Sequence, residues 1–204
     1  MGQVTGVLDW AVAARTLGGQ TESGDLHLVA PFEGGALVAV IDGLGHGPEA
    51  AEAARAACTL LAQDPTWSPA RLLQRCHEDL RRTRGVVMSL ASFTDAPSAM
   101  AWIGVGDVEA ILLRADHTAK PAREAIVLRS GVVGYQLPPL RETRHAIAAG
   151  DVLIIATDGI RRDFADRADR DDDPQAIADA VLAGHAKGTD DALVLVARYR
   201  GAVP

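Results

Sequence analysis

Short apolar runs recur along the 204-residue chain, and most of them are bounded by Gly, Pro or Asp. Runs of this length that are rich in Val, Ile and Leu are typical of β-strands. The runs at 152–157 and 192–199 are apolar at consecutive positions, so we expect these two strands to be covered on both faces. The pattern predicts strands at residues 26–32, 36–41, 86–93, 99–105, 108–114, 125–129, 152–157 and 192–199.

Three other stretches are typical of helices. Residues 48–63 are rich in Ala and begin with Pro, which favours the first turn of a helix. Residues 68–82 begin with Ser68 as a candidate N-cap, and an apolar stripe with helical spacing starts at Leu72. A third helix is predicted from 174 to 182. Two adjacent helices, many strands and one late helix do not alternate as in a parallel sheet, so we expect an α+β fold with packed sheets and outer helices.

Composition narrows the class of protein. A chain of 204 residues can bury one proper core, and a hydrophobic fraction of 48% argues against disorder. The net charge of −7 argues against a general nucleic-acid binder, which needs clustered Lys and Arg. No apolar run reaches the length of a membrane span, and no secretory leader is visible. Cys58 and Cys76 are expected to be free thiols in a reducing compartment, so we expect a cytoplasmic protein without membrane contact.

Four short segments carry the candidate chemistry, and each contains an Asp next to a Gly or a second Asp at the end of a predicted strand. An Asp at the end of an apolar strand is costly unless it reaches solvent or a cation. Each segment alone is typical of a turn. Taken together, and without a His or Cys cluster, they indicate a hard cation such as Mg²⁺ or Mn²⁺ rather than zinc. The segments are Ser23-Gly24-Asp25, Asp42-Gly43-Leu44-Gly45-His46-Gly47, Thr157-Asp158-Gly159 and Thr189-Asp190-Asp191.

Two glycine-rich segments differ in what they predict. The glycines of 42–47 permit a sharp turn from a strand into a helix and a close approach of the backbone to a metal. A phosphate-binding loop is less favoured there, because the Lys-Ser/Thr ending is missing. Gly104-Val-Gly106-Asp107 contains part of a dinucleotide-binding motif, but a strand follows it instead of a helix, so we predict a hairpin turn.

The ordered set of motifs resembles the metal-dependent Ser/Thr protein phosphatases of the PPM type. Within this family, the chain is most similar to the SpoIIE-like branch and its RsbX-type stressosome phosphatases. The similarity lies in the amino-acid sequence of residues 42–47 and in the segment Ser130-Gly-Val-Val-Gly-Tyr135. The resemblance covers about residues 5–200. It implies a four-layer αββα sandwich of two mainly antiparallel sheets, formed by a single domain over 1–204 without a flap insertion, and a binuclear Mn²⁺ or Mg²⁺ centre.

The resemblance also implies roles for individual residues. Asp42 would bridge both metals, and the Gly43 carbonyl would bind one of them. Asp158 and Asp190 would bind the metal that also touches Asp42, and Asp25 would hold the second metal through waters. Through a metal-activated water, Asp42, Asp158 and Asp190 would support attack on phosphoserine or phosphothreonine of a protein, and the expected partner is a STAS-domain regulator of a stressosome or partner-switching module.

Some positions are left open by the resemblance. Asp191 would position its neighbours and is not expected to be a ligand. Arg15 lies ten residues ahead of Asp25 and is not assigned to the phosphate-binding Arg that many relatives carry before the first acidic motif, and His46 is either a general acid or a solvent-facing turn residue. The main alternative for the whole chain is a catalytically inactive protein with the same fold that binds a signalling partner; retention of all the expected carboxylates favours the enzyme.

Overall fold

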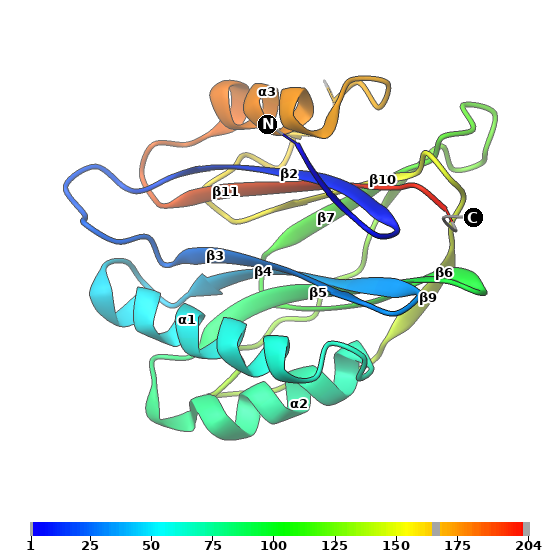
Figure 1. The fold of residues 1–204 in the computed structure, drawn as a ribbon. Coiled ribbons are helices and arrows are strands. Elements are labelled where there is room, and N and C mark those ends of the chain that lie inside the picture. Colours follow the sequence, from blue (N-terminus) through cyan, green and yellow to red (C-terminus); the bar gives the residue numbers. More distant parts are fainter. Residues whose placement is uncertain (1, 165–167, 202–204) are drawn as a thin grey trace.

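Two antiparallel sheets pack face to face and carry helices on their outer sides (Figure 1). The computed structural model describes residues 2–164 and 168–201. One sheet has the strand order β1-β2-β11-β10-β7-β8 and lies under helix α3, and the other has the order β3-β4-β5-β6-β9 and lies against α1 and α2. The αββα layering predicted from the sequence resemblance is confirmed.

The elements fall into three groups. The six-stranded sheet contains β1 Gln3–Thr5, β2 Leu8–Arg15, β7 Glu109–Leu113, β8 Arg123–Ala125, β10 Val152–Ala156 and β11 Ala192–Tyr199. The five-stranded sheet contains β3 Asp25–Phe32, β4 Gly35–Gly43, β5 Val86–Asp95, β6 Ser98–Val105 and β9 Thr143–Ala146. The helices are α1 Pro48–Gln63, α2 Pro69–Asp79, the 3₁₀ turn η1 Leu80–Arg82 and α3 Pro174–His185.

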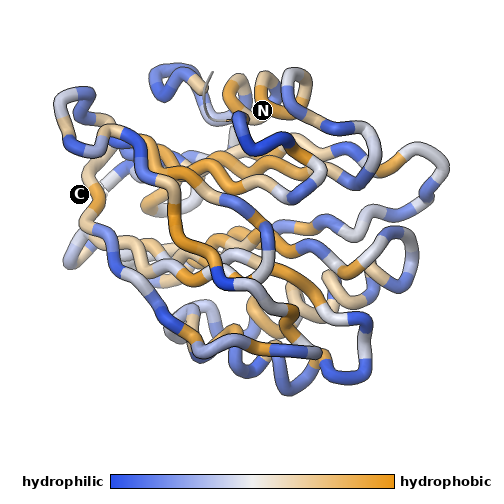
Figure 2. Tube along the Cα trace, turned by 180° about the vertical axis from the view of Figure 1, so that it is seen from behind, coloured by the Kyte–Doolittle hydropathy of each residue, from blue (hydrophilic) through white to orange (hydrophobic). Residues whose placement is uncertain are grey.

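β10 and β11 are apolar at consecutive positions because both faces of these central strands are buried. In β10, Leu153 and Ile155 belong to the core between the sheets, whereas Val152 and Ile154 pack with residues of α3. The side chains of β11 alternate between the same two cores, because successive residues of a strand point to opposite faces of the sheet. The apolar strands run through the middle of both sheets in Figure 2. The prediction that these two strands are covered on both faces is confirmed.

The helices begin where the sequence predicts, but two of them end differently, since α2 stops at Asp79 and α3 continues to His185. α1 begins at Pro48 and buries its alanines against the five-stranded sheet. The Ser68 hydroxyl accepts a hydrogen bond from the backbone N–H of Arg71 and caps α2, which passes into η1 instead of continuing as one α-helix. The Asp173 carboxylate accepts from two backbone N–H groups at the start of α3. Among the described residues, none of the helices combines the length and the apolar composition that a membrane crossing requires.

The sequence interpretation was wrong around residues 104–107. These residues do not form a hairpin turn, because β6 and β7 belong to different sheets and the chain crosses between them. Gly106 has a φ of +99°, and a Cβ there would lie 2.3 Å from side-chain atoms of Val87. The Ser89 hydroxyl donates to the Val108 carbonyl at 2.7 Å and holds the chain after the crossing.

The strand predicted at 125–129 is also corrected. β8 ends at Ala125, after three residues that pair with β7. The N–H of Ile126 still donates to Ala110 of β7, but by Arg129 the chain has left the six-stranded sheet, since the Arg129 N–H donates to Gly104 and its carbonyl accepts from Gly106. Three strands lie outside the sequence prediction: β1, β2 and β9.

Candidate functional site

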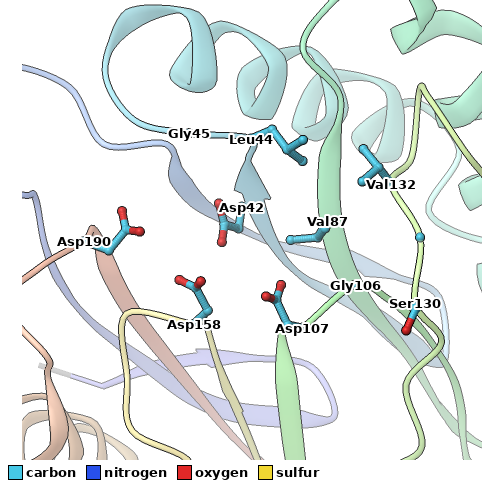
Figure 3. A pocket seen from close by; sticks show the side chains of 11 residues that line it. Asp42, Leu44, Gly45, Val87, Gly106, Asp107, Ser130, Val132, Asp158 and Asp190 are labelled. Carbon is cyan, nitrogen blue, oxygen red and sulfur yellow. The ribbon is translucent and has the colours of Figure 1, made fainter.

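Four aspartates from separate parts of the chain face one open pocket at the end of the sandwich. Asp42 ends β4, Asp107 precedes β7, Asp158 follows β10, and Asp190 precedes β11. Figure 3 shows their carboxylates turned toward a common space. The pocket has a volume of about 400 Å³ and is also lined by Leu44, Gly45, Val87, Gly106, Ser130, Gly131 and Val132. The structure therefore brings Asp42, Asp158 and Asp190 together, as the sequence predicts.

Two glycines permit this convergence. A Cβ on Gly43 would lie 2.1 Å from the backbone oxygen of Ala50, so the start of α1 can approach the end of β4 only over a glycine. A Cβ on Gly159 would lie 1.8 Å from the backbone oxygen of Asp191. Gly159 therefore lets the turn after Asp158 pack directly against the turn before β11.

Asp25 lies behind the pocket and does not line it. It pairs with Asp42 across β3 and β4, is only 4% exposed, and accepts a hydrogen bond of 2.7 Å from the Thr157 hydroxyl. The pKa of Asp25 is raised to about 7, first by burial and then by the negative charges of Asp191, Asp158 and Asp190, while the Thr157 hydrogen bond acts in the opposite direction. The predicted role of Asp25 through bridging waters is consistent with this recessed position.

Like charges disfavour the ionised form of the carboxylates in this pocket. Burial, followed by repulsion from carboxylates that include Asp25 and Asp158, raises the pKa of Asp42 to about 9. Burial also raises the pKa of Asp158, followed by repulsion from Asp107 and Asp190. Such a cluster is relieved when a cation binds, because an opposite charge favours the ionised form.

Asp191 holds the neighbouring loop instead of facing the pocket. Its carboxylate is 3% exposed and accepts hydrogen bonds of 2.7 Å from the backbone N–H groups of Leu17 and Gly24. The Gly24 carbonyl in turn accepts from the Gly43 N–H. These contacts connect the start of β11 with the segment before Asp25 and with the end of β4, which is the positioning role expected for Asp191.

Asp107 is the site residue that the sequence interpretation missed. It was assigned to a hairpin turn, but the crossing between sheets places it in the pocket beside Asp158. The available signal is the one that selects three of the four segments: an Asp next to a Gly at the end of an apolar strand. His46 is exposed and does not line the pocket. Arg15 lies at the end of β2 opposite Ala192, and its side chain is close to Gly188.

The donor set fits hard divalent cations that retain water. All the ionisable side chains lining the pocket are carboxylates, and Gly43, which directly follows Asp42 at the end of β4, does not itself line it. Within residues 2–164 and 168–201, no group of three or more His, Cys, Asp or Glu side chains is close enough to hold an ion directly. Mg²⁺ commonly keeps several waters and uses one or two carboxylates, so the spacing suits water-mediated coordination.

Comparisons with known proteins agree with this architecture. Residues 33–200 match the family model of stage II sporulation protein E (SpoIIE). No curated protein matches the chain in sequence. The structure described as "The bacterial stressosome: a modular system that has been adapted to control secondary messenger signaling" is similar, with a TM-score of 0.85 and 29% identity over 94% of this chain and 99% of that one.

Two phosphatase-related structures share the fold. RsbX in complex with magnesium has a TM-score of 0.85 and 18% identity over 98% of both chains. The PP2C phosphatase domain of SpoIIE from Bacillus subtilis, with a fragment of its regulatory domain, has a TM-score of 0.78 and 21% identity over 97% of this chain and 63% of that one. Because the family model spans most of the chain, the chain belongs to the SpoIIE family, and its sandwich has the fold of the PP2C phosphatase domains.

Proposed function

We propose that this protein hydrolyses phosphoserine or phosphothreonine on a signalling protein with the help of two Mn²⁺ or Mg²⁺ ions. The observation that carries the proposal is the convergence of strand-end carboxylates on one open pocket, in a chain of a phosphatase family. Asp42, the Gly43 carbonyl, Asp158 and Asp190 would hold the metals, and Asp25 would act through waters. When bound, the metals would activate a water molecule and stabilise negative charge on the phosphoryl oxygens.

The residues of the chain have separate tasks in this proposal. Asp42, Asp158 and Asp190 hold charge at fixed positions because each is attached to the end of a rigid central strand. Asp191 keeps the segment before Asp25 in place through two backbone hydrogen bonds. Positioning on strands suits this reaction, since phosphoryl transfer depends on alignment and charge stabilisation more than on covalent chemistry by the protein.

For the substrate we propose a phosphorylated STAS-domain regulator of a stressosome or partner-switching module. The support is the high structural similarity to RsbX and to the structure from the stressosome study. We place the reaction in the cytoplasm, in line with the two cysteines, Cys58 and Cys76, which are both free thiols. We further propose that residues 1–204 form one phosphatase domain without a flap insertion.

Phosphate release from a phosphoserine peptide tests the proposed activity. We expect turnover with Mn²⁺ or Mg²⁺, no turnover with a chelator, and a loss of at least about a hundredfold in Asp42→Asn. Asp116→Asn is the matched control, because Asp116 is exposed and lies in the loop after β7, at the end of this strand away from the pocket. A wild-type protein that binds its partner but releases no phosphate with either metal would instead show the catalytically inactive alternative.

A further inference from the structure

A second cavity continues the carboxylate pocket on the side of the six-stranded sheet. It has a volume of about 240 Å³ and shares Asp107 and Asp158 with the first pocket. Unlike the first pocket, it is lined by two cationic side chains, Arg162 and Lys187. The remaining lining residues are Glu109, Thr157, Ile160 and Phe164. The two cavities therefore adjoin at Asp107 and Asp158, and the cationic side chains line only the second one.

Lys187 is placed beside Asp158 by the backbone. The N–H of Lys187 donates to the Gly159 carbonyl at 2.8 Å, and Ile160 pairs with Ala186 in an antiparallel bridge. Two segments that are far apart in sequence therefore run side by side, and Lys187 is fixed next to the turn that carries Asp158. Its ammonium group is close enough to favour the ionised form of Asp158.

The ammonium group of Lys187 is available to a ligand. Within the described part of the chain, no carboxylate oxygen lies within 4 Å of it, and its side chain is exposed. An ammonium that stays out of an ion pair while it lines the same cavity as Asp107 and Asp158 has room for an anion between them.

Arg162 is the second cationic side chain of this cavity. Its Nε lies 2.9 Å from Oε1 of Glu109, but the side chains are 81% and 29% exposed, so this ion pair is weak and can be exchanged. The planar guanidinium keeps its two terminal nitrogens for an incoming oxyanion, which arginine binds through parallel hydrogen bonds.

We propose that this cavity is an anion subsite of the active site, in which Lys187 and Arg162 bind anionic oxygens of the substrate. The inference rests on the proposed phosphatase function. The oxygens have two possible sources with the same chemistry: the phosphoryl group itself, or a carboxylate next to the phosphorylated residue. In either case the two cations offset the negative charge that the substrate brings to an acidic pocket.

Equilibrium binding measured by calorimetry tests the subsite without requiring turnover. Inorganic phosphate is titrated into the Mg²⁺-loaded wild type, Lys187→Gln, Lys187→Arg, Arg162→Gln and the control Lys120→Gln. Lys120 is an exposed lysine of the loop between β7 and β8, at the far end of β7 from Asp107. If phosphoryl oxygens occupy the subsite, Lys187→Gln weakens phosphate binding about tenfold, Lys187→Arg restores most of it, and Lys120→Gln changes nothing.

A second arm of the same experiment tests whether a substrate carboxylate, rather than the phosphoryl group, occupies the subsite. Two phosphoserine peptides, with Glu or Gln beside the phosphoserine, are titrated into the same variants. If a substrate carboxylate occupies the subsite, the wild type prefers the Glu peptide several-fold and Lys187→Gln and Arg162→Gln lose this preference, while phosphate binding is unchanged. The proposal is overturned if neither variant alters phosphate binding or peptide preference. Absence of turnover in the wild type would count against the phosphatase function alone, because the binding arms still decide the subsite.

Discussion

At the scale of single residues, the site is a group of carboxylates whose burial is unfavourable without a cation. Asp42 shows this most clearly, since burial and its neighbours raise its pKa to about 9. Asp25 shares the effect, with a pKa of about 7. In each case the folded protein binds a proton more tightly than the unfolded chain does. The free energy of unfolding of the metal-free protein therefore falls as the pH rises from about 4 toward 9.

We therefore predict that Asp42→Asn stabilises the metal-free protein at neutral pH while it removes activity. The substitution keeps the volume and removes the charge that the site disfavours. We expect a gain of about 1 kcal/mol or more at pH 8 and a smaller loss of stability between pH 5 and pH 9 than in the wild type. Thermal unfolding in chelator across this pH range measures both effects. A wild-type stability that is flat with pH would contradict the raised pKa of Asp42.

A second prediction concerns the close approach at Gly159. Because a Cβ there would lie 1.8 Å from the Asp191 carbonyl oxygen, Gly159→Ala must displace the turns that carry Asp158 and Asp190. We expect a loss of about 2–4 kcal/mol in the free energy of unfolding and weaker Mn²⁺ binding. Gly184→Ala is the matched control, because it is in α3 and nothing lies within 4 Å of its Cβ position. A helical Gly→Ala change of this kind is expected to be neutral or stabilising.

At the scale of elements, the loop before β3 is held in place by a side chain at the start of β11. The Asp191 carboxylate accepts from the N–H groups of Leu17 and Gly24, and Gly24 in turn contacts Gly43 at the end of β4. One buried side chain thus links three elements that meet at the site. Its position explains why two consecutive aspartates precede β11, one facing the pocket and one anchoring a loop.

We therefore predict that Asp191→Asn loosens the loop and weakens metal binding without removing a ligand. The amide offers one acceptor oxygen in place of two and turns its NH₂ toward a backbone donor, so one hydrogen bond is lost. Hydrogen exchange at the Leu17 and Gly24 amides should become at least about tenfold faster, and the Kd for Mn²⁺ should rise. Unchanged exchange at both amides would rule out this anchoring role.

The sequence predicted those parts of the fold that have a local signal. Strands buried on both faces, such as β10 and β11, are visible as unbroken apolar runs, and α2 is visible from its Ser68 cap. β2 was not predicted, since its pattern mixes Asp9 and Arg15 with alanines and its identity as a strand depends on pairing with β11, almost the whole chain away. Asp107 was missed for a related reason: whether Gly106-Asp107 forms a hairpin or a crossing depends on which sheet the next strand joins.

At the scale of the whole molecule, the two sheets form a rigid sandwich that presents the carboxylates from both sides of the cleft. Asp42 comes from the five-stranded sheet, whereas Asp107, Asp158 and Asp190 adjoin strands of the six-stranded sheet. A cation between them would therefore connect the sheets at this end of the molecule. Binding to the folded state alone stabilises a protein by mass action.

Mn²⁺ should accordingly raise the unfolding temperature of the wild type. At a concentration of about one hundred times Kd, the expected gain is about 2.7 kcal/mol. Asp158→Ala combined with Asp190→Ala removes two carboxylates from the side of the six-stranded sheet and should abolish the gain. A double variant that responds to Mn²⁺ like the wild type would mean that the ions bind elsewhere on the protein.

The central claim is that Asp42, Asp158 and Asp190 hold the catalytic metals, and the location of bound Mn²⁺ tests it most directly. The measurement is anomalous diffraction from crystals of the wild-type protein grown with Mn²⁺. The account predicts two peaks in the carboxylate pocket, with at least one about 2.2 Å from an Asp42 carboxylate oxygen. A pocket without Mn²⁺ in crystals of protein that is active in the same buffer would contradict it.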